Sequence, residues 1–235
     1  MIAGRLHQRL QRHGIAHGQI PGAVGMDMVP CAADAGVRDV LRFQRAGRRV
    51  GGHGIEVDDS VEEIARLDVV VEIDALLRGL PETWTMRNEG EKTMSAFDVV
   101  VHLIHAERTN WMPRAQMILQ FVESRSFEPF DRWGQMQESR SKPLGNLLDE
   151  FARLRSESIS KLRALKLRPE DLDRLGKHPT LGEVTLSQLL ATWAVHDLTH
   201  LHQISRVMAY QYREAVGPWS VNLGVLHCDG HSAAS

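Results

Sequence analysis

The stretch that decides the fold is WAVHDLTHLHQI, residues 193–204, which lies deep inside the last long amphipathic segment of the chain. An α-helix turns by about 100° per residue, so His196 and His200 lie about 40° apart around its axis. Both imidazoles can therefore face one metal ion. Gln203 lies on the same face, whereas His202 points to the other side.

The helix that contains this stretch has a well-marked beginning and end. Thr185 followed by Gln188 is the pattern of a capping box, in which the two side chains satisfy free backbone N–H groups of the first turn. Gly217 and Pro218 then stop the helical pattern. The sequence predicts one long helix from residue 185 to about residue 214.

Three further long helices precede this one, and no segment makes a convincing strand. They are expected over residues 60–78, over 95–122 and from about 141 to 167. Each of the first two helices begins with a serine, and an acidic residue stands three positions after it. This is again the pattern of a capping box. Pro113 should kink the second helix near Thr109, and Pro143 fits the first turn of the third. Four helices with two long connections predict an all-α four-helix bundle.

The composition changes sharply at Ser60. Residues 1–59 hold ten of the 19 glycines and contain no Ser, Thr, Lys or Trp. We expect an N-terminal extension over residues 1–59, the bundle over 60–222 and a tail over 223–235. Two hypotheses for the extension stay open: a flexible segment, or translation upstream of a true start near Val50, Val57 or Val61.

Charge and cysteine content exclude several classes of protein. The 28 basic and 30 acidic residues give a net charge of −2, which provides no electrostatic surface for nucleic acid. Two cysteines make no disulfide framework, and no apolar run approaches the ~18 residues that a membrane span needs. We expect a soluble, cytoplasmic protein without nucleic-acid or membrane partners.

A metal site needs a third ligand, and the second helix offers His102 and His105 in an apolar stretch. Histidines that project inward from facing helices are how bundles build metal sites. A hydrogen-bonded core histidine is the alternative. Asp197 stands where the zinc-protease signature has Glu, but it is one methylene shorter. We therefore expect it behind the ligands or in solvent rather than acting as a base.

The sequence resembles the DinB/YfiT-like superfamily over residues 60–222. The order and spacing of seven motifs carry the resemblance. They are LPExW at 80–84, SAFDVVVHL at 95–103 followed by AE at 106–107, FDR at 130–132, LLDEF at 147–151, HPxLGxVTL at 178–186, WAVHDLTHLHQI at 193–204 and YREAVGPW at 212–219.

This resemblance implies one divalent metal ion, usually zinc or nickel, held by His102, His196 and His200. Gln203 belongs to the motif without being a ligand, and His105 and His202 have no assigned role. Several members resemble enzymes that use a low-molecular-weight thiol, bacillithiol or mycothiol. Relatives are often dimers, so a homodimer is also expected.

Two functional hypotheses follow. The first is a metal-dependent enzyme, a thiol S-transferase or alternatively a hydrolase, acting on a small electrophilic molecule, because three neutral histidines leave coordination positions open. The connection over residues 123–140 or the loop over 176–182 would shape its pocket, with Trp193 and Arg206 as candidate substrate contacts. The second is a non-catalytic, stress-related protein that binds a metal or a small molecule.

Overall fold

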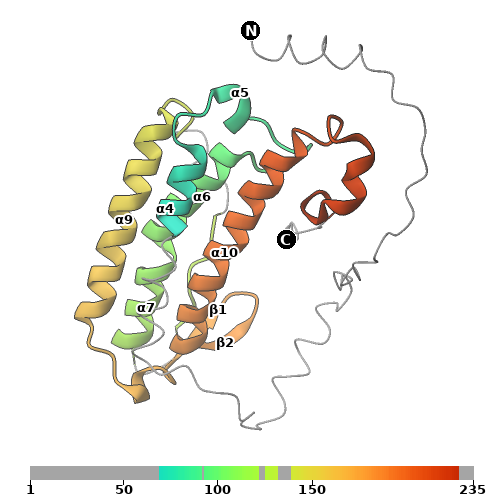
Figure 1. Cartoon of the computed structure of the whole chain (residues 1–235). Coiled ribbons are helices and arrows are strands. Elements are labelled where there is room, and N and C mark those ends of the chain that lie inside the picture. The colour runs from blue at the N-terminus through green and yellow to red at the C-terminus, as the bar shows by residue number, and fades with distance from the viewer. Residues whose placement is uncertain (1–68, 92, 122–124, 132–138, 228–235) are drawn as a thin grey trace, which may run out of the picture. The chain divides into compact units, whose positions relative to one another are not determined.

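The computed structural model describes residues 69–91, 93–121, 125–131 and 139–227. Its helices are α4 (Val69–Leu77), α5 (Glu82–Thr85), α6 (Ala96–Thr109), α7 (Trp111–Gln120), α9 (Leu144–Ala164) and α10 (Leu186–Tyr210). α6 packs against α9 and α10, and α4 packs against the same two helices (Figure 1). The predicted four-helix bundle is confirmed, with α6 and α7 together forming its second member.

The expected second helix is interrupted next to Thr109, where the sequence predicts a kink. α6 ends at Thr109, Asn110 is a turn residue whose φ of −104° and ψ of −66° deviate from regular helix within the right-handed region, and α7 starts at Trp111. Pro113 has no N–H to donate to the carbonyl of Thr109, so the helical ladder breaks within the turn that precedes the proline. The interruption makes Trp111 the first residue of a new helix.

Two of the predicted capping boxes lie in the described residues, and both form. The Ser95 hydroxyl accepts from Asp98 N at 3.1 Å, and the Asp98 carboxylate accepts from Ser95 N at 3.0 Å. Thr185 and Gln188 make the same pair of bonds at the start of α10. The capping box expected at Ser60 lies outside the described residues.

The remaining helix boundaries differ from the prediction by a few residues. Pro143 is the N-cap residue of α9 rather than part of its first turn, because its ψ of 142° is extended. α10 ends at Tyr210 rather than near residue 214, and turns follow it. Two 310 helices, Gly217–Asn222 and Gly224–Leu226, close the described part of the chain, and the second packs against α10.

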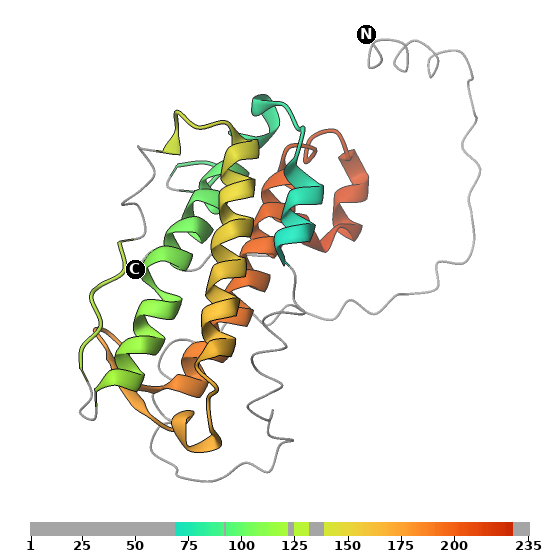
Figure 2. The ribbon, with the colours of Figure 1, turned by 90° about the vertical axis from the view of Figure 1, so that its left-hand side faces the viewer.

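A β-hairpin replaces the loop expected between α9 and α10. β1 (Leu175–His178) pairs antiparallel with β2 (Gly182–Thr185). His178 Nδ1 accepts from the backbone N–H groups of Thr180 and Leu181, and Gly182 takes a positive φ of 81° that favours glycine. The hairpin lies where α7 ends and α10 begins (Figures 1 and 2).

The hairpin also fixes the chain that follows α7. Phe127 N donates to Lys177 O at 2.8 Å, and Lys177 N donates to Arg125 O at 3.0 Å. A side chain at Gly176 would place its Cβ 2.4 Å from Cζ of Phe127, so only glycine leaves room for this ring. β1 thus anchors the segment over residues 125–131, which continues to the histidines described below.

No helix in the described ranges combines the length and the apolarity that crossing a membrane requires. The predicted boundary between residues 59 and 60 lies outside the described residues, as does the whole N-terminal extension. The expected division into an extension, a bundle and a tail therefore stays a prediction.

Candidate metal centre

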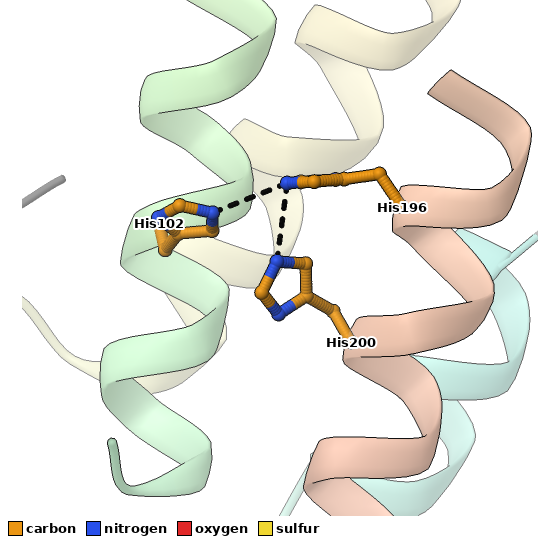
Figure 3. A group of neighbouring side chains, drawn as sticks. All are labelled: His102, His196 and His200. Carbon is orange, nitrogen blue, oxygen red and sulfur yellow. Dashed lines mark hydrogen bonds between the residues drawn. The ribbon is translucent and has the colours of Figure 1, made fainter. Parts of the chain in front are cut away.

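Three histidines meet between α6 and α10 (Figure 3). His196 Nε2 lies 3.2 Å from His102 Nε2 and 3.1 Å from His200 Nε2. Each residue offers one ligand atom, and these three atoms all lie within 4.8 Å of one another. The structure therefore brings together the three residues that the sequence resemblance singles out, one from α6 and two from adjacent turns of α10.

The separations fit a single metal ion. Ligand nitrogens at about 2.0–2.1 Å from a tetrahedral ion lie about 3.3 Å apart, close to the two measured distances. Only histidines make up the group, and three imidazoles are the donor set of open sites such as that of carbonic anhydrase. The residues present thus fit a divalent metal ion.

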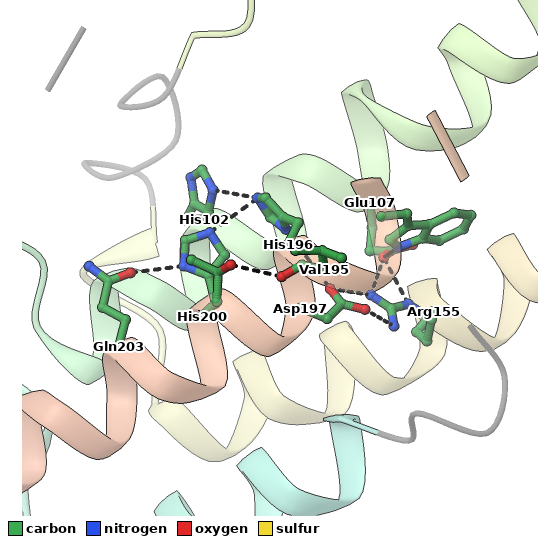
Figure 4. Close-up of polar contacts among 10 residues, drawn as sticks. His102, Glu107, Arg155, Val195, His196, Asp197, His200 and Gln203 are labelled. Atoms are coloured by element: carbon green, nitrogen blue, oxygen red, sulfur yellow. Dashed lines mark hydrogen bonds and ion pairs between the residues drawn. The ribbon is translucent and has the colours of Figure 1, made fainter. Parts of the chain in front are cut away.

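Gln203 fixes the tautomer of His200. Its Oε1 lies 2.8 Å from His200 Nδ1 and can only accept, so His200 carries its proton on Nδ1 and keeps a lone pair on Nε2 (Figure 4). His196 Nε2 carries at most one proton, so it cannot donate a hydrogen bond to both His102 Nε2 and His200 Nε2. A cation between the three nitrogens satisfies all of them.

The site reaches solvent through His196. His102 and His200 are buried, with 4% and 6% of their surfaces exposed, whereas the side chain of His196 is 22% exposed. Two of the three imidazoles are therefore enclosed in the bundle, and the third lies partly at its surface. A small molecule can approach the group from the side of His196.

Two aromatic rings that sequence reasoning did not assign to the site border the histidines. The Trp111 ring contacts His196 edge-on at 5.0 Å between centroids, and the Phe130 ring lies 5.5 Å from His102. Phe130 also contacts His105, at 5.0 Å. The sequence signal for Trp111 was Pro113, which marks the helix break after which Trp111 begins α7. Phe130 belongs to the FDR motif at 130–132, to which the sequence analysis gave no role.

Of the two segments expected to shape the pocket, the connection after α7 supplies Phe130 directly. The other, over residues 176–182, contributes through the backbone bonds of Lys177 to Arg125 and Phe127. His105 lies against Phe130 outside the ligand group, and burial lowers its pKa. His202 is likewise outside the group.

Asp197 is neither exposed to solvent nor directed at the ligand nitrogens. It is 1% exposed and accepts two hydrogen bonds from Arg155 of α9, from Nη1 at 2.7 Å and from Nη2 at 3.0 Å. Arg155 Nε also donates to Glu107 Oε1 of α6 at 2.8 Å. We call these three residues the ion network (Figure 4). It ties α6, α9 and α10 together beside His196.

The two candidate substrate contacts make structural contacts instead. Trp193 is 1% exposed, donates from Nε1 to Glu107 Oε1 at 3.2 Å and stacks on Trp111 with an interplanar angle of 7°. Arg206 is 7% exposed and forms two hydrogen bonds with the carboxylate of Glu89, at 3.0 and 2.5 Å. Both side chains are engaged inside the protein, so their expected role is not supported.

Comparison with known families gives one match: the model of the DinB superfamily matches residues 71–204. No curated protein matches the chain. Among solved structures, YfiT from Bacillus subtilis, described as a probable metal-dependent hydrolase with an unusual four-helix bundle topology, is 18% identical, with a TM-score of 0.58 over 70% of this chain and 91% of that one. The four-helix bundle protein TT2238 is 18% identical, with a TM-score of 0.41 over 63% of this chain and 97% of that one.

Proposed function

The chain belongs to the DinB superfamily, and on this basis we propose that it holds one divalent metal ion with His102, His196 and His200 and catalyses transfer of a thiol to a small electrophilic molecule. The observation that carries the proposal is the convergence of three Nε2 atoms with separations of 3.2 and 3.1 Å. The description of YfiT as a metal-dependent hydrolase supports the metal and leaves hydrolysis as the alternative reaction.

The residues around the triad have distinct parts in this proposal. A divalent ion held by three neutral imidazoles keeps further coordination positions open and supplies Lewis acidity there. Gln203 holds the proton of His200 on Nδ1, so that Nε2 stays a ligand. Trp111 and Phe130 border the site with apolar surface that keeps water away from bound substrate.

The carboxylate nearest to the ligands favours transfer of a thiol over hydrolysis. In zinc proteases a Glu beside the ligands acts as general base on water, but here Asp197 is held in two hydrogen bonds by Arg155. A divalent ion in this site would deprotonate a bound thiol outright, whereas it would lower the pKa of bound water only to about 7. The thiol therefore needs less help from a base in this position.

Metal content tests the first part of the proposal. The purified protein should contain about one equivalent of zinc or nickel by elemental analysis, and a His102→Ala/His200→Ala variant should contain none after dialysis against a weak chelator. Circular dichroism of both proteins checks that the bundle is intact. A folded double variant that retained one tightly bound equivalent would place the metal elsewhere.

Turnover tests the second part. The metal-loaded protein is assayed with bacillithiol, mycothiol and glutathione against monochlorobimane, and separately with simple esters. Thiol conjugation that the double variant lacks would support the transferase, and ester cleavage alone would support the hydrolase. Absence of both with bound metal would support a non-catalytic metal-binding or small-molecule-binding protein, the second hypothesis from the sequence. The homodimer and the cytoplasmic location also remain proposals.

A further inference from the structure

The ion network next to the triad holds unequal charges. Glu107 and Asp197 each bring one carboxylate and Arg155 brings one guanidinium. All three are buried, with 4%, 1% and 6% of their surfaces exposed. Among the described residues, Arg155 is the one Lys or Arg in contact with either carboxylate. With both carboxylates ionised, the network carries one negative charge in excess.

The contacts of Glu107 show why that excess is unusual. Its Oε1 accepts from Arg155 Nε, and from Trp193 Nε1 at 3.2 Å, while its Oε2 is buried without a hydrogen-bond partner. Burial raises the pKa of Glu107, and both the attraction of Arg155 and a hydrogen bond with Ser158 oppose that rise. A buried carboxylate with one oxygen unpaired destabilises a fold by itself.

The excess charge lies next to the proposed metal site. Asp197 follows His196 in α10, and Asp197 Oδ1 is 3.9 Å from His196 Nδ1. Arg155 joins this carboxylate to that of Glu107 through contacts of 2.7 Å. Three neutral imidazoles leave the full charge of a dication uncompensated. Electrostatic attraction in a buried region is far less screened than in water.

We infer that the Glu107–Arg155–Asp197 network is a built-in counter-charge that raises the affinity of the three-histidine site for a divalent cation, with Glu107 supplying the excess carboxylate. The inference rests on the proposed metal site and adds a buried negative charge that comes from residues other than the metal ligands. It predicts opposite effects on the two states of the protein. The excess charge destabilises the metal-free protein and stabilises the metal-bound one.

Glu107→Gln is the variant that tests this. Its amide oxygen still accepts from Arg155 and Trp193, while the network becomes neutral. Affinities for Zn²⁺ and Co²⁺ are measured by competition with a chromophoric chelator, and the Co²⁺ absorption spectrum reports the ligand geometry. We expect the Glu107→Gln protein to bind both metals about tenfold more weakly than the parent, with an unchanged Co²⁺ spectrum. Without metal, it should resist urea at least as well as a control variant that has lost one exposed acidic charge.

Glu72→Gln is the matched control. Glu72 belongs to α4 of the same bundle, and its substitution removes the same formal charge by the same chemical change, but its side chain is exposed and forms no ion pair with any described residue. Water and salt screen such a charge, so affinity should stay within about twofold of the parent protein. If Glu107→Gln fails to fold, Glu107→Met removes the charge with a side chain of similar length, and the same loss of affinity is expected.

The outcomes separate the inference from the function beneath it. If Glu107→Gln binds metal as tightly as the parent and the control do, the counter-charge inference is overturned and the proposed metal site stands. A weaker affinity accompanied by an altered Co²⁺ spectrum also overturns the counter-charge inference, because Glu107 would then act by positioning the ligands. A parent protein that binds no metal, or a double histidine variant that binds it normally, overturns the proposed function and this inference with it.

Discussion

Gln203 Oε1 lies 2.8 Å from Nδ1 of His200, one turn along the same face of α10. A glutamine three residues after a ligand histidine can reach back to it because helical side chains at i and i+3 are neighbours. The contact settles which nitrogen of His200 faces the other two histidines. Gln203 therefore controls which nitrogen His200 presents, although Gln203 is not one of the three clustered histidines.

Replacing Gln203 with Leu should weaken metal binding by about tenfold, the lower end of what outer contacts to ligand histidines contribute. The loss arises because His200 is no longer held in the tautomer that presents Nε2. Competition with a chromophoric chelator measures it. Gln203→Glu keeps an acceptor oxygen and should retain the affinity; equal losses in both variants would contradict the tautomer argument.

Replacing Gly176 with Ala should lower the free energy of unfolding by about 1–3 kcal/mol, as overpacking does. The new Cβ would lie 2.4 Å from Phe127 Cζ and 2.8 Å from Ile118 Cγ1, both inside the protein. Urea unfolding measures the change. Gly145→Ala in α9 is the control, because its Cβ meets only Arg78 Nη1 at 3.6 Å and alanine favours helix. An equally stable Gly176→Ala protein would show that the hairpin contact is loose.

Mild acid should destabilise the metal-free protein partly through His178. Burial and, to a lesser degree, the charge of Arg114 lower the pKa of His178 in the folded state. The unfolded chain therefore binds a proton first as the pH falls through the ordinary imidazole value of about 6.5. The contribution is fully present above that pH and is lost progressively down to the folded pKa.

The test compares urea unfolding at pH 7.5 and 5.5, with chelator present, for the parent and for His178→Asn. Asn can still accept from the backbone N–H two residues on, as in an Asx turn, but does not titrate. The variant should lose less stability on acidification than the parent. A larger loss in the variant would reverse the sign argued here.

Replacing Phe130 with Ala should change substrate binding and leave the metal in place. Phe130 contacts His102 and His105 through its ring but contributes no ligand atom. We expect an unchanged metal content and a KM for the electrophile about five times higher, with kcat less affected, because the ring binds ground and transition states alike. Loss of metal from this variant would show that Phe130 supports the ligands themselves.

Local patterns were sufficient to predict the helices and two of the three histidines that the structure brings together. Ser95 with Asp98, and Thr185 with Gln188, act within one turn, so the sequence alone identifies them. His196 and His200 are likewise one turn apart. His102 became a candidate ligand because it lies in an apolar helix, and family resemblance selected it over His105.

Contacts between distant segments explain what sequence reasoning missed. Arg155 and Asp197 are 42 residues apart, and nothing near either residue indicates that they pair. The candidate substrate contact Trp193 turned out to be held by Glu107, 86 residues away. β1 and β2 have four residues each, too few for a periodic pattern to distinguish them from a loop.

The three clustered histidines and the Phe130 ring that contacts His102 belong to separate parts of the protein. Helices joined by a buried ion network hold the histidines, whereas main-chain hydrogen bonds to β1 hold the segment that carries Phe130. Main-chain bonds form with almost any side chain. Substitutions at Phe130 and its neighbours can therefore alter the surface beside His102 without disturbing the three histidines. An engineer seeking a new specificity can randomise residues 128–131 first and leave the helices untouched.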